Sequence, residues 1–374
     1  MHTERNKFGL SDMEDQRQLT STLPSLDVRV RALMRLAPCE AEEEHFNRLA
    51  LEIFAVQFAG APIYGEFCAA RGVAPNAIQH WTQIPTLPTS AFKEHLVSSL
   101  PENERSRVFH SSGTTGHAPS RHFHSGASMA LYETSVLAGI KWNLAFSPSF
   151  FIFLTPLPAA APHSSLVHMF ETIRQRLGEI DSFYAGGLES DGAWSLDFAR
   201  LTSSLKMAIS NDRPVGLLGT TFSFVHLLDH LAEGKIRLRL PPRSWAMETG
   251  GYKGRSRVVA KIELRRLITK HLGLAGRQIV TEYGMSELSS QAYDIGTGLF
   301  QFPPWVRTRI ISPETGAVAA AGETGLLRIF DLANLYSVAA LQTEDLAIQR
   351  EGGFELLGRP AWAEPRGCSL MAAT

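Results

Sequence analysis

The middle of this 374-residue chain repeats one plan several times: an apolar strand-like segment, a loop of small residues and an amphipathic helical segment. The plan occurs as SFFIFLTPL before SSLVHMFETIRQRL, as PVGLLGTTF before SFVHLLDHLAEG, and as RQIVTEYGMSE after a helical segment from about 255 to 271. Strands that alternate with helices predict a parallel sheet in an α/β fold. Ligands of such folds bind at the carboxyl ends of the strands, so the loops after these strands are where a site is expected.

Different patterns flank this middle part. From about 41 to 71, apolar residues recur at helical spacing after acidic residues, which stabilise the amino end of a helix. Beyond about residue 302 the pattern changes to short strand-like runs joined by turns that contain glycine. We therefore expect a helical section over residues 1–100, an α/β core over 101–300, a β-rich subdomain over 301–360 and a flexible tail over 361–374.

Composition excludes several classes of protein. The chain has 36 lysines and arginines against 37 acidic residues, so no overall charge favours a nucleic-acid or anionic membrane partner. The longest apolar run, FFIFLTPLPAAAP at 150–162, is too short to span a bilayer. Three widely spaced cysteines, Cys39, Cys68 and Cys368, indicate neither a disulfide framework nor a zinc site. Because the first residues lack the apolar segment of a signal peptide, we expect a cytoplasmic protein without a membrane span.

The strongest local signal is HSSGTTG at 110–116, a loop in which glycines bracket hydroxyl side chains. Such a loop can curl so that backbone N–H groups and hydroxyls point into one concavity suited to phosphate oxygens. Arg121 adds a cation that can form charge-assisted bonds to the same anion. The ending of a Walker A loop is absent, and an ordinary surface turn is the alternative. The candidate phosphate ligands are Ser111, Ser112, Gly113, Thr114, Thr115 and Gly116.

Four histidines surround this loop: His110, His117, His122 and His124. They raise the question of a metal site, because histidine is a common zinc ligand. His122 and His124 would share one face only in an extended segment, and no cysteine or carboxylate lies close by in sequence to complete a ligand set. We interpret these residues as surface or loop histidines.

Two further loops accompany strand-like segments. METGGYKGR carries the paired glycines Gly250 and Gly251, which allow close backbone approach to a flat ligand, and Lys253 supplies positive charge. TEYGMSE places Tyr283 where its ring can stack on a base, and Glu287 offers the oxygen ligand that Mg²⁺ prefers. Each motif alone is also consistent with an ordinary loop.

A fourth signal lies near the end of the chain. Asp345, in the sequence TED, is expected at the end of a strand. A carboxylate there can accept hydrogen bonds from both hydroxyl groups of a ribose. A hairpin is expected at 351–354, and Gly358 and Arg359 lie beyond it. By itself the motif favours a turn residue at Asp345.

In sequence order these four motifs resemble the nucleotide-binding motifs of the adenylate-forming superfamily of acyl-CoA ligases and peptide-synthetase adenylation domains. Within it the chain looks most like the LuxE family of acyl-protein synthetases, the fatty-acid-activating component of bacterial bioluminescence systems. The resembling segments run from residue 84 to the C-terminus: IPTLPTSAFKE, SSGTTG with SRH, SSLVHM, METGGYKGRSR, EYGMSELSSQAY and AEPRGCSL. Together they are specific, although no single one is.

The resemblance implies the large N-terminal domain of the adenylate-forming fold, with doubly wound sheets plus a β-rich subdomain. It implies ATP and Mg²⁺ as cofactors and a carboxylic acid, expected to be a fatty acid, that reacts to acyl-AMP and pyrophosphate. Residues 111–116 and Arg121 would bind the phosphates, and Glu287 would lie near the metal. The other nucleotide contacts that it implies are Gly250, Gly251, Tyr283, Gly284, Ser286, Asp345 and Arg359.

The chain departs from the superfamily pattern at its C-terminus. Larger members continue past the Gly-Arg hinge into a small lid domain with a lysine that contacts the reacting oxygens, whereas here Arg359 lies close to the end of the sequence. We expect that lid domain to be absent. Either Lys253 or Arg121 would replace the lysine, or a partner protein would close the site.

The tail carries Cys368 in RGCS. A terminal segment with a glycine is expected to be mobile, so its thiol can reach an acyl-adenylate, and Arg366 favours the thiolate. In LuxE-like enzymes a cysteine near the C-terminus is acylated and hands the acyl group to a reductase partner, and Cys368 matches that place. An incidental thiol is the alternative. We expect an acyl-accepting partner, either a reductase or a carrier protein.

The acid-binding residues are less well specified. Phe222 and Trp245 flank the adenine-side segments and would line an apolar pocket or belong to the core, and His163 would lie near the substrate carboxylate. Two other functions stay open. One is an aryl or other carboxylate-adenylating ligase that passes acyl-AMP to a carrier protein or CoA, and the other is a non-catalytic nucleotide-binding protein.

Overall fold

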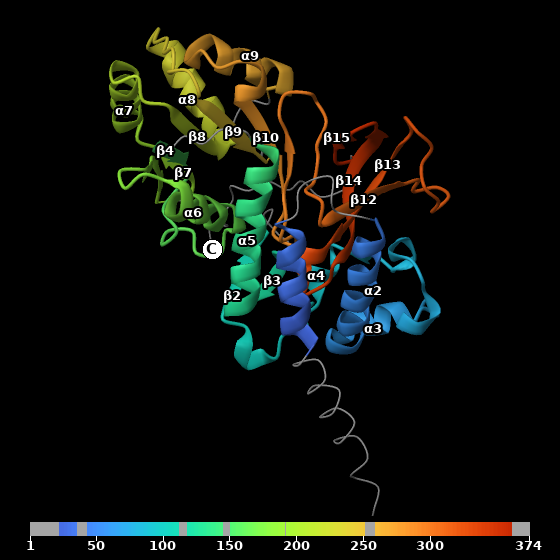
Figure 1. Cartoon of the computed structure of the whole chain (residues 1–374). Helices are drawn as coiled ribbons and strands as arrows, with labels where there is room; N and C mark the ends of the chain where they lie inside the picture. The colour runs from blue at the N-terminus through green and yellow to red at the C-terminus, as the bar shows by residue number, and fades with distance from the viewer. Residues whose placement is uncertain are drawn as a thin grey trace, which may run out of the picture.

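Six strands form the central sheet of the computed structural model, in the order β11-β10-β9-β8-β4-β5 (Figure 1). The structure describes residues 22–35, 43–111, 118–144, 150–190, 192–250 and 259–360. Five strands are parallel: β4 (Phe150–Leu154), β5 (Phe183–Tyr184), β8 (Val215–Thr220), β9 (Trp245–Thr249) and β10 (Ile279–Tyr283). β11 (Ala292–Asp294) runs antiparallel to β10. The parallel α/β sheet predicted from the sequence is confirmed.

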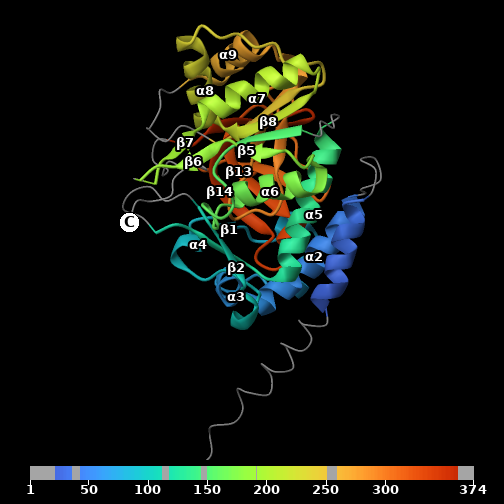
Figure 2. The same cartoon turned by 90° about the vertical axis from the view of Figure 1, so that its left-hand side faces the viewer.

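Helices cover both faces of this sheet. α7 (Phe198–Ser210), α8 (Thr221–Glu233) and α9 (Lys261–Leu272) lie on one face, and α5 (Gly126–Asn143) and α6 (Ser165–Leu177) lie on the other (Figure 1 and Figure 2). Successive side chains of a strand point to opposite faces, so a strand covered on both sides needs a continuous apolar run. In β4, Phe150, Ile152 and Leu154 pack under α7–α9, whereas Phe151 and Phe153 pack under α5 and α6.

One helix begins later than its sequence pattern predicts. α9 begins at Lys261 rather than near residue 255, because Ala260 has a ψ of 145° and so cannot continue the helix toward the N-terminus. At the other end Gly273, with a φ of 75°, adopts the left-handed conformation that closes the helix. Residues 251–258 lie outside the described residues.

A second, five-stranded sheet joins distant parts of the chain. β12 (Val306–Ile311), β13 (Thr324–Asp331), β14 (Ala340–Arg350) and β15 (Gly353–Gly358) pair antiparallel, as the short strand-like runs beyond residue 302 predict. β1 (Leu87–Pro88) comes from the first hundred residues and pairs in parallel with β14. The second sheet is therefore completed by the N-terminal part of the chain.

The N-terminal helices pack against this second sheet. A helix over 22–33, α2 (Glu43–Gly60) and α3 (Pro62–Ala69) share one apolar core with β12, β13 and β14. In it the ring of Trp81 meets that of Phe330 edge-on, with centroids 4.7 Å apart, and Cys68 is buried with a free thiol. The division of the chain at residues 100, 300 and 360 stays a prediction; in the structure the first and third of those sections share a core. Cys39 lies outside the described residues.

Smaller elements complete the fold around the site. β2 (Arg107–His110) pairs with β3 (Arg121–His124), and β6 (Gly186–Leu188) pairs with β7 (Trp194–Leu196). The short helices are α4 (Ala91–Glu94), η1 (Pro75–Ala77), η2 (Trp81–Gln83), η3 (Glu102–Glu104), η4 (Gly276–Gln278) and η5 (Leu332–Asn334). Among the described residues, no helix is long and apolar enough to cross a membrane, and no separate lid domain is present.

Candidate active site

The carboxyl ends of four parallel strands meet at one edge of the central sheet. From β4 the chain continues to β5 on one side, and it then adds β8, β9 and β10 on the other side. The strand order therefore reverses between β4 and β8, and such a switch point opens a crevice for ligands. Thr155, Thr220, Gly250 and Gly284 lie at or just beyond these strand ends. The candidate site lies along this edge.

The expected phosphate loop connects β2 to β3. Its two ends are joined, because the Ser111 N–H donates to the Ser120 carbonyl at 3.2 Å and the Ser120 N–H donates to Ser111 Oγ at 2.9 Å. Arg121 follows directly, half-buried and paired with His110 in the hairpin. The rest of the loop lies outside the described residues: Ser112, Gly113, Thr114, Thr115 and Gly116.

A run of buried polar side chains follows β10. Five of them are each at most 6% exposed: Ser286, Glu287, Ser289, Ser290 and Gln291. Buried polar groups need hydrogen-bond partners, and β3 and the residue before it supply two of them. Ser120 Oγ lies 3.2 Å from Ser286 Oγ, and His122 Nδ1 lies 2.8 Å from the Ser286 carbonyl oxygen. Ser286 Oγ in turn donates to Glu287 at 2.9 Å. The end of the phosphate loop is thus bonded to Ser286, which itself bonds Glu287.

The second sheet holds the same segment from another side. Asp331 accepts hydrogen bonds from the Ser289 N–H at 3.0 Å and from Ser290 Oγ at 2.7 Å, and burial raises its pKa to about 6. Asn334 Nδ2 donates to the Glu287 carbonyl at 2.7 Å. The two sheets therefore meet at the segment that carries Glu287.

Asp345 lies inside β14 rather than at a strand end, which corrects the expectation from the sequence. Leu326 and Arg328 of β13 pair regularly with β14, but between these two pairs three residues of β14, Asp345 among them, lie opposite the single residue Leu327. Such a β-bulge can change the direction in which a side chain points. The Tyr283 hydroxyl donates to Asp345 at 2.7 Å. Arg359, beyond the expected hairpin of β14 and β15, donates to Asp345 at 3.2 Å and to Glu344 at 2.8 Å. The structure thus brings Tyr283, Asp345 and Arg359 together.

Gly250 follows β9 at the same edge. The Thr221 hydroxyl, at the start of α8, donates to the Gly250 carbonyl at 2.9 Å and contacts the carboxylate of Glu248. On the neighbouring strand Glu282 accepts a hydrogen bond from Thr249. Burial raises the pKa of Glu282 to about 7, and the charge of Glu248 adds to this shift. Two expected neighbours lie outside the described residues: Gly251 and Lys253.

Two histidines near the loop have a different environment from the one inferred from sequence. His122 and His124 are each 2% exposed, so they are core residues rather than surface or loop residues. The reason is the extended hairpin, in which alternate residues of β3 point inward. Burial lowers the pKa of His122 to about 4. In the part of the chain that the structure describes, no cluster of three or more His, Cys, Asp or Glu residues could hold a metal ion.

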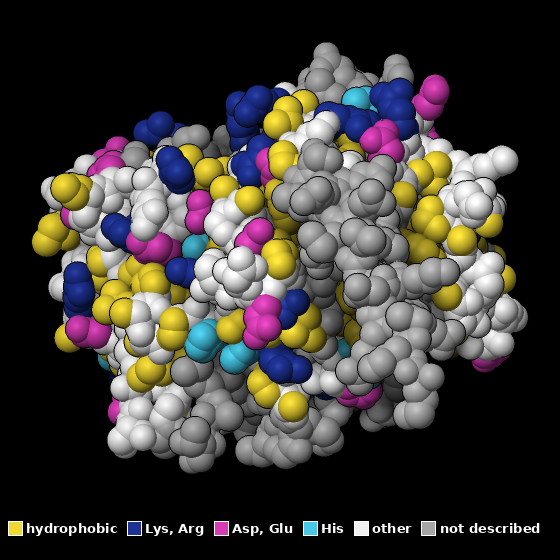
Figure 3. Space-filling model, turned by 90° about the horizontal axis from the view of Figure 1, so that it is seen from below, with side chains coloured by type: hydrophobic (Ala, Val, Ile, Leu, Met, Phe, Trp, Pro, Cys, Tyr) yellow, Lys and Arg dark blue, Asp and Glu magenta, His cyan; other side chains and the backbone are white. Residues whose placement is uncertain are grey.

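His163 lies beside the start of the phosphate loop. Its ring stacks on that of His110 with centroids 4.6 Å apart, and its carbonyl accepts a hydrogen bond from the His110 N–H at 2.9 Å. Burial, together with His163 and Arg121, lowers the pKa of His110. On the face seen from below, histidine side chains lie next to basic and acidic ones at the surface (Figure 3).

The two aromatic candidates lie at opposite ends of the sheet. Phe222, in the first turn of α8, is at the carboxyl edge and packs on His226 with ring centroids 4.2 Å apart. Trp245 begins β9, at the far end of that strand from Gly250, and packs in the core under α5 and α6. The structure brings Phe222 to the candidate site and leaves Trp245 away from it.

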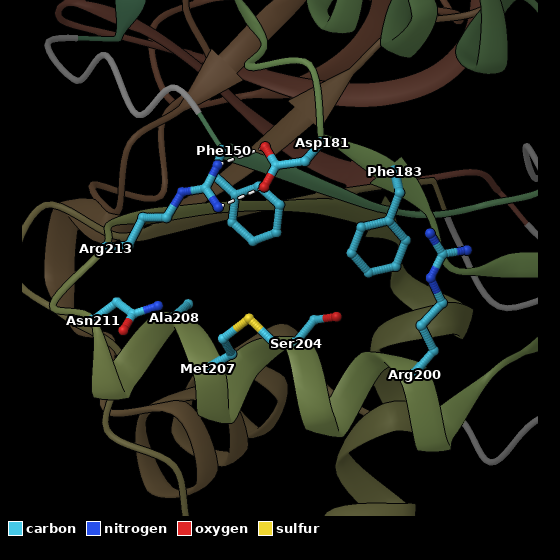
Figure 4. Close-up of a pocket in the computed structure, with 9 residues that line it drawn as sticks. All are labelled: Phe150, Asp181, Phe183, Arg200, Ser204, Met207, Ala208, Asn211 and Arg213. Atoms are coloured by element: carbon cyan, nitrogen blue, oxygen red, sulfur yellow. Dashed lines mark hydrogen bonds and ion pairs between the residues drawn. The ribbon is translucent and has the colours of Figure 1, made fainter.

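A cavity of about 180 Å³ lies at the amino edge of the sheet (Figure 4). Phe150 and Phe183, which begin β4 and β5, border it, and Met207 of α7 points toward it. Arg213 closes one side through hydrogen bonds of 2.6 Å to Asp181. No predicted site residue is among those that line this cavity, so it is separate from the candidate site.

Sequence reasoning missed the residues that hold the segment after β10. His122, Asp331 and Asn334 make these contacts, and none of them was assigned a role. The one sequence signal that could have indicated these contacts is the polar segment SELSSQ, which follows a strand that is buried on both faces. A polar segment in such a place needs internal partners, which come from other strands.

Comparison with solved structures gives the class of protein that shares this fold. An open conformation of 2-hydroxyisobutyryl-CoA ligase matches with a TM-score of 0.60 and 16% identity, over 87% of this chain and 79% of that chain. The same ligase in its thioesterification state matches with a TM-score of 0.61 and 15% identity, over 82% of this chain and 64%, less than two thirds, of that chain. The fold is that of the adenylate-forming enzymes, as the sequence motifs implied.

Residues 15–373 match the model of the family described as acyl-protein synthetase, LuxE. The chain belongs to this family, and it is accordingly an AMP-forming ligase that makes an acyl-adenylate and transfers the acyl group. It is 23% identical over 350 residues to the long-chain-fatty-acid–luciferin-component ligase of Aliivibrio fischeri, covering 89% of each chain. It is 22% identical over 342 residues to the ligase of the same name from Vibrio harveyi, covering 88% of each.

Proposed function

We propose that this protein activates a fatty acid with ATP and transfers the acyl group to its own Cys368 for delivery to a partner such as an acyl reductase. The observation that carries the proposal is the convergence of separate segments on one sheet edge: the phosphate loop, Gly250, Ser286 with Glu287, and Asp345 with Arg359. The names of the two bacterial relatives, ligases of a long-chain fatty acid and a luciferin component, support the acid and an acyl-accepting partner.

The proposed nucleotide contacts follow from this arrangement. The hydroxyls and N–H groups of residues 111–116 bind the phosphates of ATP with Arg121. Gly250, Gly251 and Tyr283 surround adenine, and Gly284 is a further nucleotide contact. Asp345 and Arg359 bind the ribose. Each carboxylate oxygen can accept more than one hydrogen bond, so Asp345 can hold the ribose hydroxyls while it keeps its bonds to Tyr283 and Arg359.

Glu287 is the proposed ligand of Mg²⁺. This ion binds through one or two carboxylates together with phosphates and waters, so a single well-held carboxylate fits it. Glu287 is fully buried and accepts a hydrogen bond from Ser286 Oγ at 2.9 Å, and the described residues contain no group of three or more His, Cys, Asp or Glu that could hold a metal ion elsewhere. When bound, Mg²⁺ would neutralise negative charge on the phosphates.

The proposed reaction has two steps. In the first, an oxygen of the substrate carboxylate attacks the α-phosphorus of ATP, the bond from that phosphorus to the bridging oxygen breaks, and pyrophosphate leaves. The carboxylate is already ionised at neutral pH, so catalysis comes from positioning and from neutralisation of phosphate charge by Arg121 or Lys253. In the second, the Cys368 thiolate attacks the acyl carbon, AMP leaves, and a thioester remains. Cys368 lies outside the described residues.

The proposed acid site lies beside His163 and Phe222. His163 adjoins the start of the phosphate loop, where the carboxylate must meet the α-phosphate, and Phe222 offers apolar surface at the same edge. Trp245 is not part of the proposed acid site, because it lies at the other end of β9.

ATP–pyrophosphate exchange with a panel of fatty and aromatic acids tests the activation step. We expect exchange with long-chain fatty acids. Faster exchange with aromatic acids would favour an aryl-acid ligase. ATP binding without exchange on any acid would favour a non-catalytic nucleotide-binding protein.

Intact-mass measurement after incubation with ATP and the best acid tests the transfer step. We expect an adduct with the mass of the acyl group on the wild-type chain and no adduct on Cys368→Ser, with exchange activity preserved. An adduct that persists in Cys368→Ser would reject Cys368 as the acceptor.

A further inference from the structure

The backbone on both sides of the Glu287 side chain is held by buried side chains from other segments. His122 Nδ1 lies 2.8 Å from the Ser286 carbonyl oxygen, in the peptide group just before Glu287, and Asn334 Nδ2 donates to the Glu287 carbonyl at 2.7 Å. A carbonyl oxygen only accepts hydrogen bonds, so Nδ1 of His122 carries the hydrogen. With both peptide groups anchored, the direction in which the Glu287 side chain leaves the backbone is set.

His122 is itself held firmly. Its ring lies 4.3 Å from that of His124, centroid to centroid, and the ring of Phe92 lies 5.7 Å away at an angle of 85°. The side chain is 2% exposed. Burying an imidazole costs free energy unless its polar atoms are hydrogen-bonded, so an apolar residue would fill this position more favourably if packing were the only requirement. The hydrogen bond to the Ser286 carbonyl explains why a histidine, rather than an apolar residue, occupies this buried position.

The place of His122 in the chain connects it to the phosphate loop. Ser120, two residues earlier, closes the loop by its bonds to Ser111 and also contacts Ser286 Oγ at 3.2 Å. One short stretch of chain therefore both ends the loop and binds the segment that carries Glu287. A displacement of this stretch would move the loop and the Glu287 carboxylate together.

We propose that His122 is a positioning residue that aims the Glu287 carboxylate at the metal–phosphate group and couples it to the phosphate loop. The inference rests on the proposed function, because it takes Glu287 as the Mg²⁺ ligand. His122 acts through the Ser286–Glu287 backbone and need not touch substrate. Residues that orient metal ligands in this indirect way commonly alter metal affinity about 10- to 100-fold when replaced.

Two replacements of His122 separate its hydrogen bond from its bulk. In Asn the side-chain nitrogen is separated from Cβ by one carbon, as Nδ1 is in His, so His122→Asn keeps a donor near the Ser286 carbonyl. In Gln the nitrogen lies one carbon further out, so His122→Gln removes the donor from that place. His124→Gln is the matched control, since His124 is equally buried on the same face of β3 and bonds Ser128 instead.

The test is calorimetric ATP binding over a range of free Mg²⁺ concentrations, with a melting curve for each variant. We expect His122→Gln to raise the half-saturating free Mg²⁺ by about tenfold, and His122→Asn and folded His124→Gln to stay within about threefold of wild type. A wild-type Mg²⁺ dependence in His122→Gln, or an equal shift in His124→Gln, would overturn the inference. If His122→Gln does not fold, a tenfold shift in folded His122→Asn would overturn it as well.

The binding measurement needs no turnover, so a failure of the His122 inference can be distinguished from a failure of the proposed function. If the wild-type protein binds ATP with Mg²⁺ but catalyses pyrophosphate exchange with no acid, the proposed function is contradicted. The Mg²⁺ dependence of the His122 variants then still tests the role of His122. A wild-type protein that binds no ATP with Mg²⁺ contradicts both.

Discussion

Glu282 is a buried carboxyl near the site whose ionisation is expected to change the stability of the fold with pH. It is buried, its carboxylate accepts a hydrogen bond from Thr249, and a second buried carboxyl, that of Glu248, lies nearby. Burial and the neighbouring charge raise its pKa from 4.5 to about 7. Between these two values the folded protein keeps a proton that the unfolded chain has lost. The contribution of Glu282 to the free energy of unfolding is therefore fully present below pH 4.5 and is lost as the pH rises through 7.

Glu282→Gln is therefore expected to stabilise the protein at high pH. The amide resembles the protonated acid and has no charge to bury, so the variant should gain on the order of 3 kcal/mol over wild type above pH 7 and little below pH 4.5. Urea denaturation at a series of pH values measures the difference. Glu66→Gln, at an exposed position, is the control and should follow wild type. A difference between Glu282→Gln and wild type that does not grow with pH would contradict the assigned pKa.

At the scale of elements, β6 packs against the end of β4 at the candidate site. A Cβ added at Gly186 would lie 2.4 Å from the backbone carbon of Thr155 and 2.8 Å from the backbone nitrogen of Pro156. A Cβ at the next residue, Gly187, would meet only Ser195 Oγ, at 3.4 Å. The hairpin of β6 and β7 can approach the strand end this closely because residue 186 has no side chain.

Gly186→Ala should therefore be far more harmful than Gly187→Ala. Backbone atoms cannot move aside as a flexible side chain can, so we expect Gly186→Ala to lower the free energy of unfolding by about 1–3 kcal/mol. Gly187→Ala should change it by about 0.5 kcal/mol or less. Chemical denaturation of the two variants provides the comparison. Equal losses would show that the contact with the end of β4 does not limit the side chain at residue 186.

The elements with strong local patterns were predictable from the sequence, and those set by distant contacts were not. FFIFL predicts a strand buried on both faces, and β4 is one. The burial of His122 and His124 was not predictable, because it depends on what packs against the inner face of β3. Likewise Asp345 lies within β14 because a bulge opposite Leu327 accommodates it there, and a bulge depends on the partner strand. The start of α9 depends on one backbone angle at Ala260.

At the scale of the whole molecule, the two ends of the described chain form one structural unit. The N-terminal helices share a core with β12–β14, and the two-residue strand β1 extends the sheet beside β14. A two-residue strand carries almost no local signal, so its pairing with β14 could not be predicted. The motif order predicted which segments converge, since it follows the superfamily pattern, but not the buried bonds of Asp331 and Asn334 that hold the two sheets together there.

Gln57 provides a test of this unit. It lies in α2, is 1% exposed, donates to the carbonyls of Asn334 and Leu335 at 2.9 and 3.1 Å, and accepts from the Ala339 N–H at 2.9 Å. Gln57→Leu would leave three buried backbone groups without these partners, and each such loss costs about 1–3 kcal/mol.

We therefore expect Gln57→Leu to lower the free energy of unfolding by several times as much as Glu44→Leu, in which leucine replaces an exposed polar residue of the same helix. Hydrogen exchange followed by mass spectrometry locates the effect. Exchange should accelerate together in α2 and in β13 and β14, because these elements share one core, while β8 in the central sheet should keep more of its protection. Acceleration in α2 alone would show that the N-terminal helices open independently of the second sheet. An equal acceleration in β8 would instead show that the two sheets unfold as one unit.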